Sequence, residues 1–476
     1  MKSIAIIGGG ITGLTTAFRL QQKNIPVTLY EASARVGGVI ETSRHEGYLA
    51  EFGPNTILDT SPKIGALIRD LGLEQRRLYA DACASNRYIV RGGKPLLVPD
   101  SPLAFLMTSL FSPAAKLRLL AEPFIRPVGE DHEESLAEFV TRRIGSEFLD
   151  YAINPLVAGI YAGDPARLSV KHAFPKLYAL EKRYGSLILG QILGARERKA
   201  RPEVSKDRAR KLSFDEGLQV LTDTLSERLT KEIQFQSPVN RFRQTSRGWV
   251  VETRAEGRLE QTEHEAVVFA GPTYRLPELQ LLSDRCLSWS PLAQIHYPPV
   301  ASVVLGFRRE DVAHPLDGFG VLIPEVEGFK ILGTLFSSSL FPGRAPEGHV
   351  TLTSYIGGDR APELALSDPE TLVNLTLKDL SVILGVKGRP TFKHPVLFSK
   401  AIPQYEVGYG RYKDLMNDIE EKASGFFMAG HYRNGISLSD SIVAGHDVAE
   451  KVERFLAAPA TGAMSGAPEF ATHLAA

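Results

Sequence analysis

The chain has 476 residues, of which 43% are hydrophobic and 23% are charged, and its formal net charge is zero. This composition is typical of a globular protein large enough for more than one domain, and it predicts no general attraction to nucleic acid or anionic lipid. The two cysteines, Cys83 and Cys286, show no metal-ligand spacing, so we expect no metal site, no disulfide framework and a reducing compartment.

The two ends of the chain predict little beyond the folded part. A strand-like run begins at Ser3, and no apolar run reaches the length of a membrane span. We therefore expect no signal or transit peptide and a cytoplasmic location. Residues 458–476 are rich in small residues without periodicity, which predicts a disordered tail.

A glycine-rich motif follows the first predicted strand. Residues 3–7 are apolar, a helical pattern ends near Asn24, and a second strand ends on Glu31. Between the first strand and the helix, the motif lets the chain turn tightly and approach a pyrophosphate at the helix N-terminus, and an acid ending the second strand can bind ribose hydroxyls. An acid there also disfavours the 2′-phosphate of NADP. The predicted dinucleotide contacts are Gly8, Gly9, Gly10, Ile11, Thr12, Gly13 and Glu31.

The next part of the chain is mostly helical. Residues 61–73 predict a helix with Ser61 as N-cap and Pro62 at its first position, and residues 87–99 predict a hairpin that turns at Gly92–Gly93. Residues 101–190 have helical spacing. Within them, 101–125 is the most apolar stretch, and it fits a membrane surface, an apolar channel or an ordinary buried helix pair.

The second half of the chain contains mostly strand-like patterns. Residues 214–229 predict an amphipathic helix, and a strand meander then leads into AVVFAG (266–271), which we expect to rejoin the first sheet. Residues 300–308, 318–324, 329–336 and 349–357 are apolar and β-branched, and are separated by Gly and Pro. They predict a mostly antiparallel sheet in a second domain.

A second strand–glycine–helix unit lies near the C-terminus, in FFMAGHYRNGISLSDSIVAGHDVAEKV (426–452). We expect its strand to return to the first sheet and its helix to begin near Ser439. His431 in the turn could act as a base, but packing beside a cofactor or a loop hydrogen bond is the favoured interpretation.

Several stretches resemble one known family. EASARVGGVIET (31–42) resembles the Rx₂GG-type extension of the FAD-dependent amine-oxidase superfamily, which indicates FAD. The stretches 52–57, 86–99, 154–190, 318–324, 332–346 and 429–442 resemble the oxygen-dependent protoporphyrinogen oxidase and coproporphyrinogen III oxidase family. The resemblance runs in order to about Ala449.

The resemblance implies an α/β fold with a Rossmann-like FAD-binding domain formed by 1–80, 205–275 and 425–455. It further implies a mostly helical, membrane-associated region at 80–195 and an antiparallel substrate domain at 276–424. The implied reaction converts a porphyrinogen to a porphyrin, and O₂ reoxidises the flavin to give H₂O₂. Protoporphyrinogen IX and coproporphyrinogen III both stay open as substrates. A homodimer, with peripheral contact at the inner face of the cell membrane and no nucleic-acid partner, is also expected.

The site residues come from the same resemblance. Arg87 matches an arginine that pairs with a propionate, and the other implied substrate contacts are Asn55, Gly159, Leu322, Leu335 and Tyr355. Tyr355 stands where many relatives have Phe. The implied cofactor contacts, beyond those of the first motif, are Ala32, Arg35, Gly38, Val39, Gly53, Pro54, Asn55, Thr56, Val239, Gly430, Ile436, Ser437 and Leu438. No acid–base pair is assigned, because the cofactor supplies the hydride chemistry.

Two other functions fit the same fold. A flavin amine oxidase or carotenoid desaturase would share it, although we identify no lysine of the kind that amine oxidases place near the flavin. A non-catalytic binding protein, as in the GDP-dissociation inhibitors, would lose the flavin signature that this chain keeps at both ends.

Overall fold

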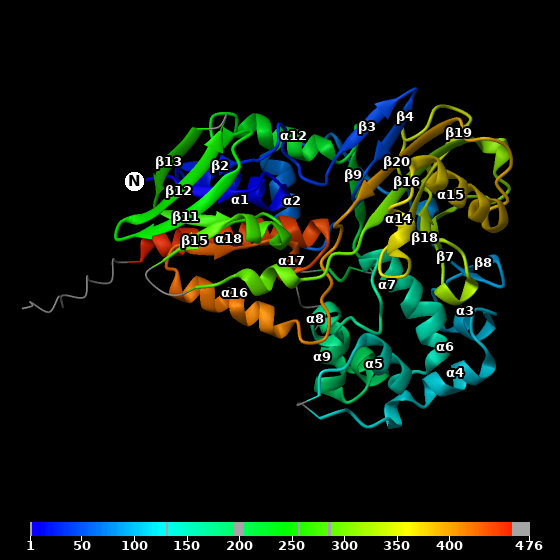
Figure 1. Ribbon diagram of the computed structural model, residues 1–476. Coiled ribbons are helices and arrows are strands. Elements are labelled where there is room, and N and C mark those ends of the chain that lie inside the picture. The colour runs from blue at the N-terminus through cyan, green and yellow to red at the C-terminus, as the bar shows by residue number, and fades with distance from the viewer. Residues whose placement is uncertain are drawn as a thin grey trace, which may run out of the picture.

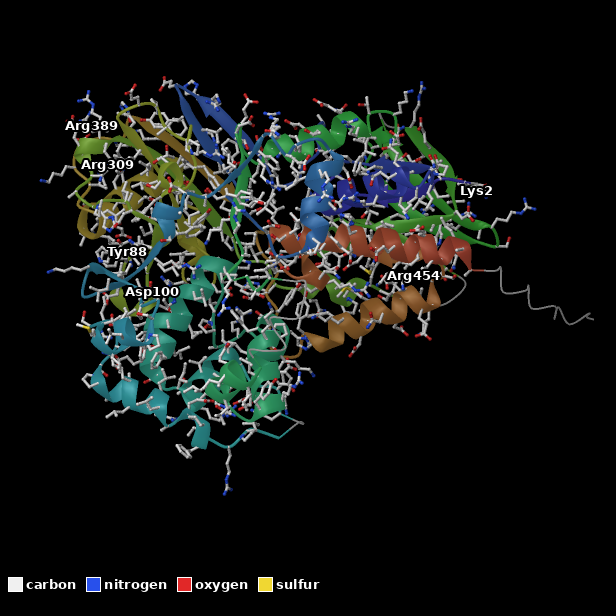
Figure 2. All side chains as sticks on the ribbon, turned by 180° about the vertical axis from the view of Figure 1, so that it is seen from behind. Lys2, Tyr88, Asp100, Arg309, Arg389 and Arg454 are labelled. Carbon is white, nitrogen blue, oxygen red and sulfur yellow. The ribbon has the colours of Figure 1, made fainter. Side chains whose placement is uncertain are left out.

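The structure is a computed structural model that describes residues 2–129, 132–194, 204–206, 208–255, 258–283 and 287–458. Figure 1 shows a unit around a parallel sheet, a second unit around a larger sheet, and a group of helices below the second sheet. Seen from behind, Lys2 and Arg454 lie at the outer end of the first unit and Arg309 at the outer end of the second (Figure 2). The predicted tail after Ala458, and Cys286, fall outside the described residues.

The first unit is built on a five-stranded parallel sheet in the order β10-β2-β1-β14-β21. Every neighbouring pair in it is parallel. Its strands are β1 (Ile4–Ile7), β2 (Val27–Tyr30), β10 (Ile233–Gln234), β14 (Ala266–Phe269) and β21 (Phe426–Met428). The returns predicted for residues 266–271 and for the C-terminal strand are therefore confirmed.

Helices pack against one face of this sheet and share a hydrophobic core with it. They are α1 (Ile11–Gln22), α2 (Pro62–Asp70), α12 (Gln219–Arg228) and α18 (Leu438–Ala457). The predicted start of α2 is confirmed, since the Ser61 hydroxyl accepts a hydrogen bond from the Lys63 N–H and Pro62 follows it. This arrangement brings the first and last helices of the fold onto the same face.

The other face is covered by a four-stranded sheet and α16 (Gly410–Lys422), around an aromatic core that includes Trp249, Trp289 and Tyr432. The four strands are β11 (Val239–Thr245), β12 (Gly248–Ala255), β13 (Arg258–His264) and β15 (Gln280–Leu282). β11, β12 and β13 pair antiparallel in sequence order, which confirms the predicted meander.

The second unit contains a seven-stranded sheet in the order β20-β16-β19-β18-β17-β7-β8. Its pairs are antiparallel except β7–β17, which is parallel. Its strands are β7 (Asn86–Arg91), β8 (Lys94–Leu97), β16 (Val300–Arg308), β17 (Gly318–Leu322), β18 (Ile331–Leu335), β19 (His349–Gly357) and β20 (Phe392–Phe398). One face packs against α15 (Pro369–Ile383), and the adjoining short helices are α13 (Ser337–Leu340) and α14 (Pro362–Ala365).

The hairpin at residues 86–97 forms as predicted, but it belongs to the seven-stranded sheet and not to the helical region. β7 and β8 pair as predicted, but β7 also pairs with β17, so the hairpin extends the sheet. The sequence interpretation had placed it in the helical region, 80–195. The physical reason is that the edge of β17 would otherwise expose a row of unpaired backbone groups, and β7 satisfies them.

Two small sheets join the units. One pairs β3 (Thr42–His45) with β4 (Tyr48–Glu51), and the other has the order β5-β9-β6, formed by β5 (Ile57–Leu58), β6 (Arg77–Tyr79) and β9 (Lys211–Phe214). The Arg344 guanidinium, from the second unit, donates to the Ser213 hydroxyl and the Phe214 carbonyl, each at 2.9 Å. These contacts attach the seven-stranded sheet to β9.

The helical region is held together by a buried ion cluster. Its helices are α3 (Pro102–Met107), α4 (Pro113–Leu120), α5 (Leu136–Arg143), α6 (Ser146–Phe148), α7 (Asn154–Tyr161), α8 (Val170–Ala173), α9 (Pro175–Tyr184) and α10 (Leu187–Leu193). Arg143 and Glu122 are 0% exposed and 3.0 Å apart, and Arg143 also pairs with the buried Glu181 of α9. Glu122 further accepts the Leu187 N–H at 2.8 Å, at the start of α10.

The apolar stretch 101–125 lies on the surface. Met107 is 79% exposed and Phe124 is 86% exposed, and the other large apolar side chains exposed here are Leu103, Leu106, Leu117 and Leu120. The alternative of an ordinary buried helix pair is therefore wrong. Among the described residues, we find no helix with both the length and the hydropathy needed to cross a bilayer.

Replacing Arg143 should strongly destabilise the helical region. Arg143→Met would leave the carboxylates of Glu122 and Glu181 buried without their shared cation, which costs about 3–5 kcal/mol of unfolding free energy. Denaturant unfolding followed by circular dichroism measures this. The control is Arg76→Met, because Arg76 pairs with Asp215 at the surface, where an ion pair contributes about 0–1 kcal/mol. Equal losses in the two variants would contradict the role of the buried cluster.

Candidate functional site

The first glycine turn connects β1 to α1 with almost no side-chain volume. A Cβ atom on Gly13 would lie 2.0 Å from the Gly8 carbonyl oxygen, so the helix can begin here only with glycine at that position. A Cβ on Gly10 would meet nothing within 4 Å, so the chain faces open space there. The backbone N–H groups at the start of α1 are therefore accessible to an anionic group such as a pyrophosphate.

Glu31 stands at the carboxyl end of β2, beside this turn. Its carboxylate accepts the Gly9 N–H at 2.7 Å and the Ser33 N–H at 2.8 Å. The segment that leads into β11 runs alongside, since the Ser237 N–H donates to the Glu31 carbonyl at 2.9 Å. Ala32 follows Glu31 directly and the buried Val239 lies two residues after Ser237, and their contacts with a ribose and its base stay a prediction.

Arg35 supports the loop that follows. Its guanidinium donates to the carbonyls of Val36, Ile40 and Gly38 and to the Glu41 carboxylate. These bonds hold the 35–41 loop in a closed turn and leave the Val39 side chain 54% exposed. Arg35 therefore shapes the wall of the site, and a direct contact with the cofactor stays a prediction.

The helices α1 and α18 begin side by side. The Thr12 hydroxyl donates to the Ser441 carbonyl at 3.1 Å, and a Cβ on Gly445 would lie only 2.7 Å from the Thr12 carbonyl oxygen. Because α1 and α18 both follow strands of one parallel sheet, their N-termini meet at the carboxyl edge of that sheet. Two positive helix ends therefore face one space, which suits a ligand with negative charge at two points.

The start of α18 has a strong cap. The Ser437 hydroxyl accepts the Asp440 N–H and the Asp440 carboxylate accepts the Ser437 N–H, so the helix begins at Leu438, one residue before the expected start. Lys206 forms an ion pair with Asp440. The predicted residues Ile436, Ser437 and Leu438 therefore lie in a firmly held turn.

The loop before β5 is attached to the same helix end. The Ser439 hydroxyl accepts the Leu58 N–H at 2.8 Å and donates to the Leu58 carbonyl at 2.7 Å. This double contact places the predicted segment Gly53, Pro54, Asn55 and Thr56 beside the start of α18. The predicted cofactor residues from three distant parts of the sequence are thus brought together.

His431 in the C-terminal turn lacks a hydrogen-bond partner among the described residues for its buried Nε2. Burial lowers the pKa of His431 to about 4, and the Tyr297 ring contacts it edge-on at 5.8 Å between centroids. A neutral imidazole with so low a pKa is a weak base at neutral pH. This favours the packing interpretation over a catalytic base.

The predicted substrate residues share one face of the seven-stranded sheet. Leu322 pairs with Gly333, which pairs with Tyr355. On β17, Gly320 lies two residues before Leu322. Gly320 pairs with Leu335 of β18 on one side and with Arg87 of β7 on the other. Since side chains alternate across a sheet, residues two apart point to the same face. Arg87, Leu322, Leu335 and Tyr355 therefore form one surface, opposite the core against α15.

Helix α7 lies over this surface. A Cβ on Gly159 would come within 2.6 Å of Leu322 Cδ2, so the bare glycine faces the sheet. Both ends of α7 are held in place: the Asn154 side chain accepts the Glu325 N–H at 3.0 Å, and the Gln404 amide donates to the Tyr161 carbonyl at 2.8 Å. The glycine thus lets the fixed helix approach Leu322 of the fixed sheet closely.

Asn55 connects this surface to the first unit. Its side-chain amide donates to the Tyr355 hydroxyl at 2.7 Å. Burial raises the pKa of Tyr355 above its usual range, and the nearby Glu51 charge adds to this shift, so the phenol keeps its proton. Because Asn55 is the donor, the Tyr355 hydrogen is available to a group in the adjoining space.

Two charged residues near Asn55 were missed by sequence reasoning. Glu51 and Arg344 line a small cavity of about 10 Å³, whose remaining lining residues are Leu49, Asn55, Ser337, Leu340, Phe341 and Thr353. Burial raises the pKa of Glu51 to about 7, against the effect of its hydrogen bonds from Thr42 and Leu218. Both residues stand in or next to the stretches that carry the resemblance, but no spacing rule pointed to their pairing.

Comparison with known proteins assigns the fold to a family. The family model described as flavin containing amine oxidoreductase matches residues 11–452. The chain belongs to this family. It is 34% identical over 480 residues to protoporphyrinogen oxidase 2 of Arabidopsis thaliana, covering 96% of this chain and 94% of the relative. It is 31% identical over 475 residues to coproporphyrinogen III oxidase of Bacillus subtilis, covering 93% and 96%.

A solved structure from Exiguobacterium sp. 255-15 has the same fold, with a TM-score of 0.78 at 24% identity, over 95% of this chain and 99% of that one. The family membership inferred from the sequence motifs is confirmed, and the protein is an oxidoreductase with FAD as cofactor. The residues fit that cofactor, because the open glycine turn, the Glu31 carboxylate and the two adjacent helix N-termini suit its pyrophosphate, ribose and flavin ends.

Gly13→Ala should abolish FAD binding. The added methyl group would press on the Gly8 carbonyl oxygen and separate the turn from α1. We expect the Kd for FAD to rise more than tenfold, which corresponds to a loss of about 1.4 kcal/mol or more, and the purified variant to lose most of its flavin absorbance per protein. The control is Gly65→Ala in α2, where a Cβ meets nothing within 4 Å. A folded Gly13→Ala protein with full flavin content would contradict this placement of the cofactor.

Proposed function

We propose that the protein oxidises a porphyrinogen to the porphyrin, with FAD as cofactor and O₂ as the final electron acceptor. The observation that carries this proposal is the apolar sheet face of Leu322, Leu335 and Tyr355, which Asn55 connects to the start of α18. An apolar face of this kind suits a flat, apolar macrocycle. The names of the two relatives, a protoporphyrinogen oxidase and a coproporphyrinogen III oxidase, support the same substrate class.

When bound, FAD would accept a hydride from the substrate and pass the electrons to O₂. The chain itself contributes binding and orientation. The N-terminus of α18 presents backbone N–H groups and a positive helix end, which stabilise negative charge that develops on a group held against Ser437 and Leu438. Tyr355 stays protonated and donates from a position that Asn55 fixes, while the absence of a side chain at Gly159 lets α7 pack closely against Leu322.

The two candidate substrates differ mainly in charge. Protoporphyrinogen IX carries two propionates and coproporphyrinogen III carries four. Arg87 is exposed at the edge of the apolar face, where a guanidinium can pair with a carboxylate that projects from the ring. We propose protoporphyrinogen IX as the substrate. Coproporphyrinogen III is kept as the alternative, because the relatives of both names have similar identity to the chain.

The decisive experiment compares the turnover of both porphyrinogens by the purified protein, followed by porphyrin fluorescence and H₂O₂ release. We expect both signals with at least one porphyrinogen. Arg87→Ala should raise KM about tenfold, since a hydrogen bond between charged groups contributes about 1.5–3 kcal/mol, and it should leave FAD bound because Arg87 lies on the substrate sheet.

Two results would argue against this function. Peroxide release with polyamines and none with either porphyrinogen would assign an amine oxidase instead, and a colourless protein that takes up no FAD would indicate a binding protein. An unchanged KM in Arg87→Ala would remove that residue from the site while leaving the reaction in place.

We further propose that the two units bind different molecules. The five-stranded unit, from segments 1–80, 205–275 and 425–455, would bind FAD, and the seven-stranded sheet would bind substrate. Residues 287–297 and 405–423 pack in the aromatic core of the first unit, so we propose that these segments belong to it although they lie within 276–424. A homodimer and a cytoplasmic location remain part of the proposal.

The exposed apolar side chains of α3 and α4 support a peripheral membrane contact. The set formed by Leu103, Leu106, Met107, Leu117, Leu120 and Phe124 is exposed on consecutive short helices. Single exposed apolar residues are ordinary, but a group on adjoining elements marks an interaction site. We propose that this apolar patch inserts shallowly into a lipid surface, which would also bring the site close to an apolar substrate.

Removing the patch should reduce binding to lipid. The triple variant Leu106→Ser, Leu117→Ser, Phe124→Ser should lose about tenfold or more in co-sedimentation with phosphatidylcholine vesicles, because each buried apolar side chain contributes about 1.5–3 kcal/mol. The matched control is Leu259→Ser, Leu366→Ser, Val382→Ser, whose residues are similarly exposed outside the patch. Wild-type protein that stays wholly in the supernatant would contradict the contact.

A further inference from the structure

We propose that Lys211 is a second carboxylate-binding cation of the substrate site, which acts beside Arg87 and so determines which porphyrinogens bind well. The inference rests on the proposed function. It names a residue from the first unit that would reach across to a substrate held on the sheet of the second unit.

Lys211 is the first residue of β9, between β5 and β6. Its register partner is Leu58 on one side, and its carbonyl accepts the Ala80 N–H at 2.8 Å on the other. From this fixed backbone the side chain crosses the seam between the units. Its Nζ lies 5.2 Å from the centroid of the Phe319 ring, on β17 of the seven-stranded sheet.

Phe319 lies on β17 next to the residue that pairs with Arg87. The pairing of β17 with β7 shifts between Gly318, which faces Asn86, and Gly320, which faces Arg87, so Phe319 is the extra residue between them. Lys211 therefore reaches the sheet at the step where Arg87 stands. The Arg87 guanidinium is close enough to lower the pKa of Lys211, second to burial in its effect.

No acid neutralises Lys211 within the part of the chain that the structure describes. Other lysines at the contacts of α18 do have acidic partners: Lys206 pairs with Asp440, and Lys63 pairs with Asp447 at 2.6 Å. Lys211 is half-buried and lies near the Arg87 cation, and both conditions disfavour its charged form unless an anion binds it. A lysine in this position without an acid partner of its own among the described residues is suited to an anionic ligand.

The nearest acid along β17 is engaged elsewhere. Asp317 accepts the Tyr88 hydroxyl at 2.7 Å, and Tyr88, the residue after Arg87, points to the opposite face of β7. In Figure 2 the labelled Tyr88 lies in the second unit, on the opposite side of the molecule from Lys2 and Arg454. Asp317 and Tyr88 therefore do not contribute to the face on which Arg87 stands.

The cations lie at one edge of the apolar surface. Gly320 pairs with both Arg87 and Leu335, so a ring on Leu335 would have its edge toward Arg87 and Lys211. A porphyrinogen carries carboxylates on flexible side chains at its edge, and two adjacent ones could each meet one cation. Lys211 would then favour rings with two neighbouring carboxylates over rings with one or none.

Lys211→Met tests the inference, because methionine keeps an unbranched apolar chain against Phe319 and removes the charge. We expect KM for the porphyrinogen to rise about tenfold or more, with kcat and FAD content within about twofold of wild type. Lys211→Arg should recover most of the affinity. Lys94→Met is the matched control, since Lys94 is an exposed cation at the turn of the same sheet, and it should leave KM unchanged.

A binding measurement separates charge from packing. Quenching of porphyrin fluorescence reports affinity for the diacid product and for its dimethyl ester. We expect Lys211→Met to weaken binding of the diacid about tenfold and to leave binding of the ester unchanged. A structural role alone would weaken both ligands equally.

The outcomes separate the two levels of the proposal. If wild-type protein oxidises neither porphyrinogen, the proposed function fails, and the comparison of diacid with ester still decides whether Lys211 binds carboxylates. If wild-type protein is active and Lys211→Met keeps its KM and its affinity for the diacid, the inference is overturned. Equal damage from Lys211→Met and Lys211→Arg would also overturn it, since the charge would then be irrelevant.

Discussion

The fold depends on the close approach of two helices that are far apart in the sequence. α1 and α18 touch where the Thr12 hydroxyl donates to the Ser441 carbonyl, across 429 positions of the chain. The contact requires a residue without a side chain at Gly445, and it places two positive helix ends at one edge of a parallel sheet. The strands β1, β14 and β21 are neighbours and parallel, so the segments that follow them all begin at that edge.

The substrate side is organised by the seam between the two sheets. Asn55 donates to Tyr355, Arg344 donates to β9, and Lys211 extends toward Phe319. The first two are hydrogen bonds between groups that are buried or half-buried, so their geometry is specific and a shift of one unit would leave partners unsatisfied. The third brings a cation to the face of an aromatic ring. This explains how a site formed from two units can hold a cofactor and a flat substrate in register without a large shared core.

The local parts of this structure follow from the sequence. Strand, glycine turn and helix succeed each other within a few residues at each end, so residues 3–24 predict the presence of α1 and residues 426–452 predict the start of α18 to within one residue. The Ser61–Pro62 start of α2 and the turn at Gly92–Gly93 are equally local. Family resemblance supplied the candidate substrate residues, and strand register then showed that four of them share a face.

The remaining features depend on partners distant in sequence. Nothing near residues 86–91 indicates that β7 will pair with β17, because that choice is made by an open strand edge more than two hundred residues later. The stretch 101–125 is apolar on more than one side, so periodicity could not distinguish a buried helix from an exposed one. Glu51 and Arg344 share a cavity only because β4 and the 341–346 loop meet in three dimensions.

The order of strands in the first sheet also has a consequence for biosynthesis. β21 and α18 leave the ribosome long after β1 and α1. The early segments must wait, with one sheet edge and one helix face uncovered, until residues 426–457 have been made. The flavin-binding edge is therefore completed only at that stage of translation, and a chain truncated before residue 426 would lack the second helix end that cofactor capture requires.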